Sequence, residues 1–377
     1  MRAYKFRLYP SKAQEKELNH HLWIEKNLWN ILLEKTKEKY ENEQKFLSVK
    51  EMREYAKGQG LYSQAAQSVV QNLDRSLKAK VRAKKKGQKW GFPRFKSFER
   101  VRSIFYPQSG FSLDKKLKVS PFGEIPIIRH RAMKGKIKTL SLKREASGKW
   151  HAIFSVEQEP QIQPANAGPA IGLDLGLNRL ATLSDGKIIQ NPHNFRKLEQ
   201  KLAAAQRRLS RKLRTSHNRR KAKKKVALVH EAVANARKDY LHKSANWLLS
   251  NYSKIVMEDL RINEMAEEGH GKGIHDASWG LFTHMLCYKA ASAGSEIVFV
   301  DPKDTSQECS GCHFTVQKGL WERIHQCSVC GLVLDRDINA AINILTRATV
   351  GMAGSNACGD GVIAPSLKQD ATRFSGW

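Results

Sequence analysis

The chain has 377 residues, of which 66 are Lys or Arg and 36 are Asp or Glu, so its formal net charge is +30. Hydrophobic residues make up 41% of the sequence, which is enough for a folded protein and excludes disorder as the reason for the charge. A compact chain of this charge repels itself, so we expect a polyanionic partner, either nucleic acid or an anionic membrane. The sequence contains no apolar run of about 18 residues and no signal-peptide core near Met1, so a membrane is excluded and a cytoplasmic protein is expected.

The first long segment, residues 11–86, has a helical pattern, with apolar residues mostly at spacings of three and four. A basic stretch at its end, residues 78–96, contains nine basic residues, no acid and three interleaved aromatic residues. This composition fits a surface that follows a phosphate backbone and stacks on bases, and the alternative is a solvated helix face. The candidate contacts are Lys84, Lys85, Lys86, Arg94 and Lys96.

Residues 102–156 change to a period of two, which predicts a β-rich module. Leu140 and Leu142 alternate with polar residues before a Ser147-Gly148 turn. Residues 159–169 contain three prolines and a glycine, and this composition predicts a linker after the module.

A second pattern begins at Ala170, where a short apolar run carries Asp174 at its centre and predicts the first strand of a three-stranded meander. Two long helices are expected within residues 198–249. The stretch 207–225 has eleven basic residues and no acid, which favours nucleic-acid contact over ordinary solvation. The candidate contacts are Arg207, Arg208, Arg211, Lys212, Arg219, Arg220 and Lys221.

The remaining elements are two apolar β-branched runs, 254–260 and 296–301, with a helix between them, and a last helix at 335–345. This order is that of an RNase H-like α/β domain. Asp174 in the first strand, Glu258 at the end of a later strand and Asp337 in the first turn of the last helix are then expected to converge.

Each of these acids also has an ordinary interpretation. Asp337 could complement a helix dipole with Asp335 as the N-cap, and Glu258 could be a simple strand-end residue. Asp174 is harder to explain, because a lone carboxylate in an apolar strand needs a partner. Three converging carboxylates repel one another unless divalent cations neutralise them. Two Mg²⁺ ions would suit such ligands and support phosphodiester hydrolysis.

Four of the six cysteines form two Cys-x-x-Cys pairs, Cys309/Cys312 and Cys327/Cys330, separated by 14 residues. This spacing is typical of a zinc ribbon, in which four thiolates hold one structural Zn²⁺. A disulfide pair or a thioredoxin-like redox motif is the alternative, and two matched pairs at ribbon spacing, without a secretory context, disfavour both.

Several segments resemble the TnpB proteins of bacterial insertion sequences, which are relatives of the compact type V CRISPR effectors. The similarity runs from Tyr4 to about Leu345 in the expected order. The matching segments are residues 4–10, 91–97, 172–177, 276–280, 305–312 and 335–341.

The resemblance implies an RNA-guided DNA endonuclease that binds a guide RNA from its own locus, recognises a short target-adjacent motif in double-stranded DNA and cuts with a RuvC-like domain. Asp174, Glu258 and Asp337 match the family's catalytic positions, and the Asp-x-Asn pattern with Asn339 selects Asp337 over Asp335. Base pairing with the guide then supplies sequence choice, while the protein reads backbone shape.

The resemblance also implies the domain organisation. Residues 1–10 and 87–165 would form a β-barrel wedge module, with residues 11–86 inserted as a helical recognition domain. Residues 166–303 and 334–350 would form the RuvC-like nuclease domain, interrupted by the zinc ribbon at 304–333. Residues 351–377, rich in Gly, Ser and Ala, are expected to form a disordered tail.

Gln67 matches a family position near the target-adjacent duplex and is expected to contact a base edge, although a surface glutamine is an equally good interpretation. Two other functions remain open: a non-cutting, RNA-guided DNA-binding regulator of the same fold, and an RNase H-like transposase that joins DNA ends. The first would be marked by substituted acids, whereas all three are present. A monomer that associates with the bacterial nucleoid on its target is expected.

Overall fold

The structure is a computed structural model that describes residues 1–158, 164, 166–261, 278–319 and 321–349. It divides into two compact units, Met1–Pro160 and Gln161–Trp377. The predicted tail and most of the predicted linker lie outside the described residues. In the part of the chain that is described, no helix is both long and apolar enough to cross a membrane.

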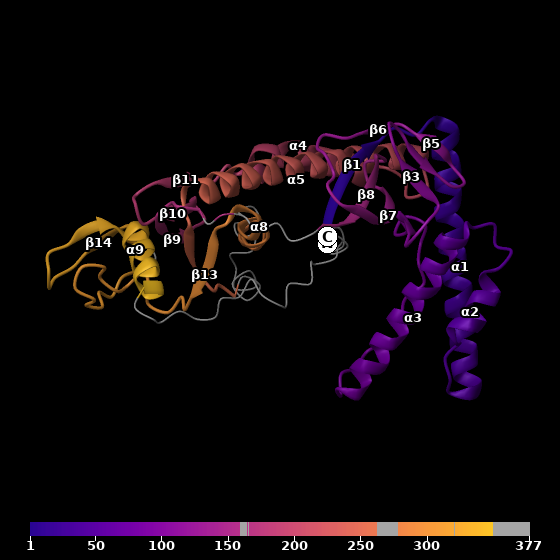
Figure 1. Cartoon of the computed structure of the whole chain (residues 1–377), viewed down its shortest axis with the longest axis horizontal. Coiled ribbons are helices and arrows are strands. Elements are labelled where there is room, and N and C mark those ends of the chain that lie inside the picture. The colour runs from indigo at the N-terminus through magenta and orange to yellow at the C-terminus, as the bar shows by residue number, and fades with distance from the viewer. Residues whose placement is uncertain (159–163, 165, 262–277, 320, 350–377) are drawn as a thin grey trace. The chain divides into compact units, whose positions relative to one another are not determined.

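The first unit contains a five-stranded and a three-stranded antiparallel sheet (Figure 1). The larger sheet has the order β2-β7-β8-β1-β6, with β1 at Arg2–Leu8, β2 at Ser103–Tyr106, β6 at Ile127–Ile128, β7 at Lys136–Arg144 and β8 at Trp150–Glu157. The smaller sheet consists of β3 (Phe111–Leu113), β4 (Leu117–Val119) and β5 (Gly123–Ile125). Alternate residues of β8 are buried, as the period of two predicts. The β-rich module is confirmed, and its closure into a barrel stays a prediction.

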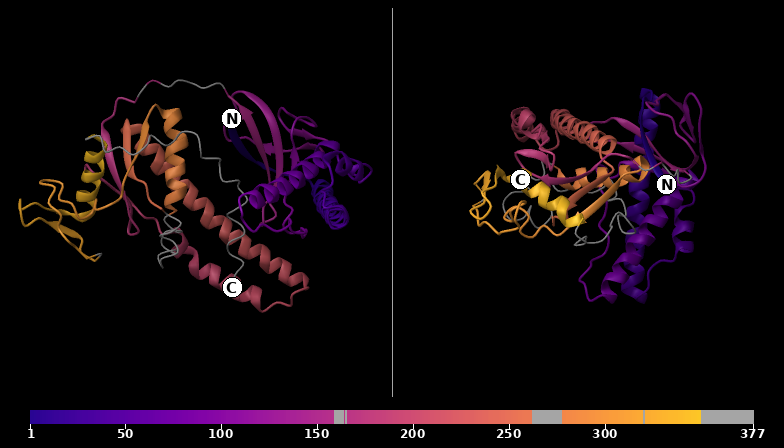
Figure 2. Two further views of the ribbon diagram at one scale, coloured as in Figure 1. Left: turned by 90° about the horizontal axis from the view of Figure 1, so that it is seen from below. Right: turned by 60° about the vertical axis from the view of Figure 1, so that its left-hand side comes forward.

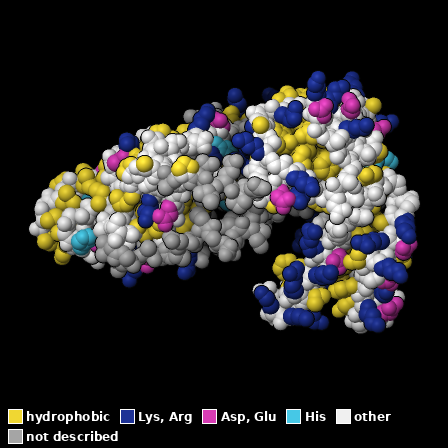
Figure 3. All heavy atoms as spheres, viewed as in Figure 1, with side chains coloured by type: hydrophobic (Ala, Val, Ile, Leu, Met, Phe, Trp, Pro, Cys, Tyr) yellow, Lys and Arg dark blue, Asp and Glu magenta, His cyan; other side chains and the backbone are white. Residues whose placement is uncertain are grey.

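Three helices complete this unit: α1 (Lys12–Glu43), α2 (Val49–Ala56) and α3 (Ser63–Lys85). Capping boxes at Ser11 and Ser48 begin α1 and α2. Apolar residues of the three helices, such as Leu32 and Leu73, form a core of their own. Lys and Arg side chains gather on the outside of these helices (Figure 3).

The sheet of the second unit has the order β11-β10-β9-β12-β13. Its strands are β9 (Ala170–Leu175), β10 (Arg179–Leu183), β11 (Ile188–Gln190), β12 (Lys254–Glu258) and β13 (Glu296–Val300). β9, β10 and β11 pair antiparallel, which confirms the predicted meander, while β12 pairs parallel with both β9 and β13.

Helices cover both faces of this sheet (Figure 2). On one face, α5 (His217–Asn251) and α8 (Trp279–Ala293) pack against Ile171, Ile255 and other apolar residues. On the other face, α9 (Arg336–Thr349) packs through Ile344 against Val256 and Val298. The predicted helix pair before β12 is confirmed, because α4 (Asn194–Ser210) packs along α5.

A short hairpin of β14 (Ile324–Gln326) and β15 (Val333–Asp335) leads directly into α9. The residues that carry the cysteine pairs are thus joined to the helix that carries Asp337.

Candidate functional site

The three predicted acids lie on the α9 face of the sheet. In β9, Gly172 faces α9, so Asp174, two residues later, lies on the same side. In β12, Val256 faces α9, and Glu258 follows it at the same spacing. Asp337 is in the first turn of α9 itself. Elements from three separate parts of the chain therefore bring one carboxylate each to this face.

The strand register explains why two of the acids are neighbours. β9 and β12 run parallel, and Leu173 pairs with Met257. Because the next residues are Asp174 and Glu258, the register brings these two side chains together at the carboxyl ends of adjacent strands.

Burial raises the pKa of Asp174 well above its usual range, and the negative charges of Glu258 and Asp337 raise it further. Arg336 opposes this shift. Burial also raises the pKa of Glu258. Glu258 and Asp337 are thus close enough to Asp174 to disfavour its ionised form, and a bound cation would relieve this repulsion.

Asp335 and Asp337 have different contacts, although they are two residues apart. The Asp335 carboxylate accepts the N–H groups of Asp337 and Ile338, at 3.0 and 3.3 Å, and pairs with Arg179 at 2.9 Å. Asp335 is therefore the N-cap of α9, as one of the ordinary interpretations predicted. Asp337 instead lies 3.5 Å from the guanidinium of Arg336, and its negative charge raises the pKa of Asp174.

The donor set fits a hard divalent cation, because it consists of carboxylate oxygens in a half-buried position. The carboxylate oxygens of the three acids do not all lie within 4.8 Å of one another. Among the described residues, the four cysteines form the only group of three or more His, Cys, Asp or Glu whose ligand atoms all lie within 4.8 Å of one another.

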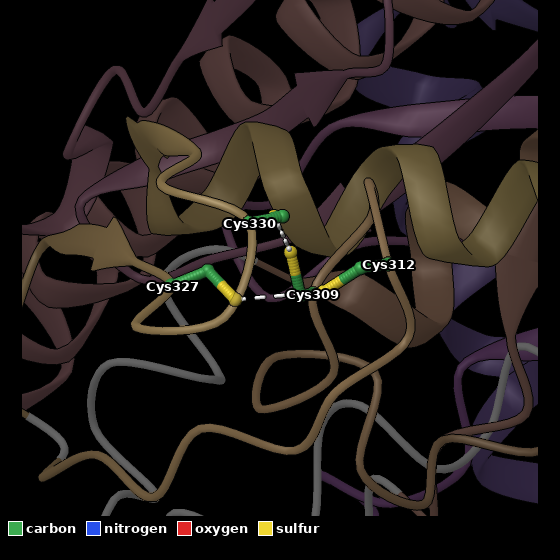
Figure 4. A group of neighbouring side chains, drawn as sticks. All are labelled: Cys309, Cys312, Cys327 and Cys330. Atoms are coloured by element: carbon green, nitrogen blue, oxygen red, sulfur yellow. Dashed lines mark hydrogen bonds between the residues drawn. The ribbon is translucent and has the colours of Figure 1, made fainter.

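The second predicted site is this group of cysteines (Figure 4). The Sγ atoms of Cys309 and Cys330 are 3.6 Å apart, and those of Cys312 and Cys327 are 3.5 Å apart. A tetrahedral zinc ion with Zn–S bonds of about 2.3 Å requires sulfur atoms about 3.8 Å apart, so the spacing fits. Hydrogen bonds from the backbone of Cys330 and Val329 lower the pKa of Cys327 to about 6, whereas burial and the neighbouring thiols raise the pKa of Cys312 and of Cys330. The four thiols are thus close enough to affect one another's ionisation, as expected for ligands of one cation.

Sequence reasoning missed the contacts of three polar residues between the two sites, although Asn339 had been used to select Asp337. Thr305, which is buried, donates its hydroxyl to Oε1 of Glu258. Asn339 and Asn343, one turn apart on α9, bind the backbone just before and within the first cysteine pair. Two sequence signals could have pointed to these residues. Thr305 is the first residue of the motif that ends at Cys312, and the spacing of four between Asn339 and Asn343 places both on one face of a helix. Neither signal shows which groups these side chains bind.

The first predicted nucleic-acid surface, residues 78–96, contains both exposed basic side chains and residues that contact α1. Lys84, Lys85, Lys86 and Arg94 are exposed, and Lys84 and Lys85 end α3. The following segment packs back onto α1: the indole N–H of Trp29 donates to the carbonyl of Arg94, and Asn30 binds both backbone groups of Lys96. The Lys96 ammonium lies over the Trp29 ring, 3.2 Å from its centroid, so this lysine has a structural contact.

The second predicted surface, at the junction of α4 and α5, contains one residue with a structural contact of its own. The Arg219 guanidinium donates to the carbonyls of Leu209 and Lys212, at 3.1 and 3.0 Å, and so closes the turn between the helices. The other predicted contacts here are exposed: Arg207, Arg208, Arg211, Lys212, Arg220 and Lys221. Gln67 is half-buried on α3.

Three family models match the chain. The OrfB_IS605 model, described as "Probable transposase", matches residues 153–268, and the model described as "Cas12f1-like, TNB domain" matches residues 279–344. A third model, described as "Helix-turn-helix domain", matches residues 1–45, where the structure has β1 and the single helix α1.

Two relatives align with almost the whole chain. One is "Putative RNA-guided DNA endonuclease InsQ" of Escherichia coli strain K12, which is 31% identical over 99% of this chain and 98% of the relative. The other is "Putative RNA-guided DNA endonuclease" of Streptomyces pristinaespiralis, which is 34% identical over 96% of this chain and 92% of the relative.

The fold is also similar to a solved structure, "Cryo-EM structure of the Cas12f1-sgRNA-target DNA complex". The TM-score is 0.54 at 13% identity, over 89% of this chain and 83% of the other. This likeness supports a multidomain α/β fold of the Cas12f kind. With the family models and the full-length relatives, it confirms the resemblance found in the sequence: the chain belongs to the TnpB family of insertion-sequence proteins.

Proposed function

We propose that this chain is an RNA-guided DNA endonuclease that hydrolyses phosphodiester bonds at the site formed by Asp174, Glu258 and Asp337. The observation that carries the proposal is the convergence of these acids from β9, β12 and α9 onto one face of a sheet, where burial and their own charges raise the pKa of Asp174. Three carboxylates brought together in a half-buried position are costly to a fold unless they bind a positively charged group.

The nuclease domain is proposed to be RuvC-like, with an RNase H-like core of residues 166–303 and 334–350. The strand order β11-β10-β9-β12-β13, with a meander followed by two parallel strands, supports this assignment. Residues 304–333 are proposed to be the zinc-ribbon insertion, since they contain both cysteine pairs. Residues 1–10 and 87–165 are proposed as the wedge module, and residues 11–86 as the recognition domain.

The three carboxylates would hold two Mg²⁺ ions, which when bound activate a water and stabilise the leaving 3′ oxygen. The protein's own contribution is to fix the carboxylates: strand register holds Asp174 beside Glu258, and the capped first turn of α9 holds Asp337. The four cysteines would hold one Zn²⁺ with no open ligand position, so this ion is structural.

The guide RNA and the double-stranded target are proposed to occupy the exposed basic surfaces. The charge of +30 supports a long polyanionic partner, and both full-length relatives are named as RNA-guided DNA endonucleases. Lys96 and Arg219 are less suited to phosphate contact than their neighbours, because they already bind within the fold.

The proposal is tested by purifying the protein with its native locus, sequencing any bound RNA, and assaying cleavage of a plasmid library that carries the matching target beside random flanks. A discrete RNA and Mg²⁺-dependent cleavage beside one flank are expected, and cleavage should disappear when the guide is removed. Asp174→Ala should keep the RNA and abolish cleavage.

Other outcomes would point elsewhere. A discrete RNA without cleavage by the unaltered protein would favour a DNA-binding regulator. Joining of element ends without RNA would favour a transposase, the activity named in the description of the matching family model.

A further inference from the structure

The backbone between β13 and the first cysteine pair is held by side chains of α9. The amide of Asn343 donates to the carbonyls of Thr305 and Glu308, at 2.9 and 2.7 Å. The amide of Asn339 donates to the same Glu308 carbonyl at 2.7 Å and accepts the N–H of Ser310 at 2.9 Å. Both asparagines are at least 98% buried, so these bonds are shielded from competing water.

The two ends of this held segment are the two metal sites. At one end, the Thr305 hydroxyl donates to Oε1 of Glu258, and Thr305 is 3% exposed. At the other end, Cys309 lies between Glu308 and Ser310, the two residues that Asn339 binds. A continuous set of hydrogen bonds therefore runs from the cysteine group to a carboxylate of the acid trio.

We propose that Thr305 is a positioning residue for Glu258, and that Asn343 and Asn339 fix the position of Thr305 relative to the first cysteine pair, Cys309 and Cys312. This inference rests on the proposed nuclease function, since it gives Glu258 its role as a metal ligand. It assigns the zinc ribbon a second task besides its own folding, which is to orient one ligand of the catalytic metal site.

The chemistry of the contact supports this assignment. A hydroxyl that donates to Oε1 restricts rotation of the carboxylate and leaves Oε2 for a cation. Outer partners of metal ligands fix ligand orientation in this way, and their loss typically costs about 10–100-fold in metal affinity or activity.

The first experiment compares Thr305→Val, Thr305→Ser and Thr346→Val in the purified RNA complex. Val removes the hydroxyl at nearly constant volume, and Ser keeps it. Thr346 is the matched control, because it lies on α9 and its hydroxyl bonds to its own helix at Ile342. Thr305→Val should raise the Mg²⁺ concentration for half-maximal cleavage about 10-fold or more. Thr305→Ser and Thr346→Val should behave like the unaltered protein.

Further readouts separate positioning from general damage. Mn²⁺ binding, followed by electron paramagnetic resonance, should weaken in Thr305→Val, with the Asp174→Ala complex as the baseline for ions held by the RNA. Zinc content, and target binding in buffer without added Mg²⁺, should not change.

The coupling to the zinc ribbon is tested with Asn343→Ala. This change should shift the Mg²⁺ requirement in the same direction as Thr305→Val, and the double variant should be little worse than either alone, since both act on one contact. Asn339→Ala should speed the loss of zinc to a chelator.

The positioning role would be overturned if the unaltered complex cleaves its target and Thr305→Val needs no more Mg²⁺ for half-maximal cleavage than Thr346→Val does. Additive effects of Thr305→Val and Asn343→Ala would overturn the coupling. Absence of guided cleavage by the unaltered complex would instead contradict the proposed function, so the two failures are distinct.

Discussion

Gly172 of β9 lies directly against the backbone of α9 at Ala341. A Cβ atom added to Gly172 would stand 1.9 Å from the Ala341 carbonyl oxygen and 2.9 Å from the Leu345 nitrogen. Asp174 follows Gly172 by two residues on the same face, and Asp337 precedes Ala341 by one helical turn. The closeness of strand and helix at this point therefore sets how near two of the three acids can come.

Gly172→Ala is expected to destabilise the second unit by about 3 kcal/mol or more, at the upper end of the cost of overpacking, because the obstructing atoms are backbone. Denaturant unfolding measures this change. Gly91→Ala is the control, since a Cβ there meets nothing within 4 Å. Equal stability of the two variants would contradict the close packing of β9 on α9.

Asp174→Asn is expected to stabilise the protein at neutral and higher pH in buffer without added Mg²⁺. Because burial raises the pKa of Asp174, the native state binds more protons than the unfolded state, and its stability falls as pH rises from the unfolded pKa of about 4 through the folded pKa. The amide removes this loss. A gain in Tm of about 2–4 °C, or about 1 kcal/mol, is expected at high pH and should shrink in acid.

Added Mg²⁺ should make the unaltered protein more stable than Asp174→Asn. It should raise the Tm of the unaltered protein more than that of Asp174→Asn, because only the former keeps all three carboxylates. A stability difference that is independent of pH would show that Asp174 does not titrate as its surroundings imply.

Cys309→Ser is expected to abolish stoichiometric zinc binding, because three thiolates and a hydroxyl make a much poorer site. One zinc per chain is expected for the unaltered protein, measured by elemental analysis. Cys287→Ala is the matched control: Cys287 is a half-buried residue of α8 and does not belong to the cysteine group. Zinc retained at full occupancy in Cys309→Ser would refute the ribbon.

The triple change Arg207→Ala, Arg208→Ala and Arg211→Ala is expected to weaken RNA binding and to flatten its dependence on salt. These residues are exposed at the end of α4, and the removal of each arginine that binds a phosphate should reduce the slope of log K against log salt by about 0.7–0.9. Binding is measured over a series of salt concentrations.

Arg219→Ala should behave differently, because its guanidinium closes the turn between α4 and α5. Local stability should fall, seen as faster hydrogen exchange at the turn, while the salt slope stays near that of the unaltered protein. A slope reduced as much by Arg219→Ala as by Arg207→Ala alone would mean that Arg219 contacts phosphate.

Local patterns were sufficient for much of the fold. The meander after Ala170, the paired helices before β12 and the helix that begins at Arg336 follow from period and punctuation along the chain. The cysteine spacing predicts one cluster, and the four sulfur atoms form it. Each of these features depends on residues close together in the sequence.

Contacts between distant residues could not be predicted in this way. Thr305 and Glu258 are 47 residues apart, and Asn339 and Glu308 are 31 apart, so no periodicity marks them as partners. Composition also counted Lys96 and Arg219 only as charge, whereas the structure shows that hydrogen bonds and a ring contact already engage them. A charge count indicates how strongly a surface attracts phosphate, but it does not show which basic side chains already bind other groups within the fold.

The order of elements along the chain has a consequence for how the protein is made. Asp174 and Glu258 are synthesised well before Asp337. Asp337 follows the β14–β15 hairpin and lies in the first turn of α9. A nascent or truncated chain that ends before α9 holds its basic helices but only two of the three carboxylates. On the proposed function, such a chain lacks one of the three metal-ligating carboxylates, and it is expected to bind nucleic acid through its basic helices without cutting it.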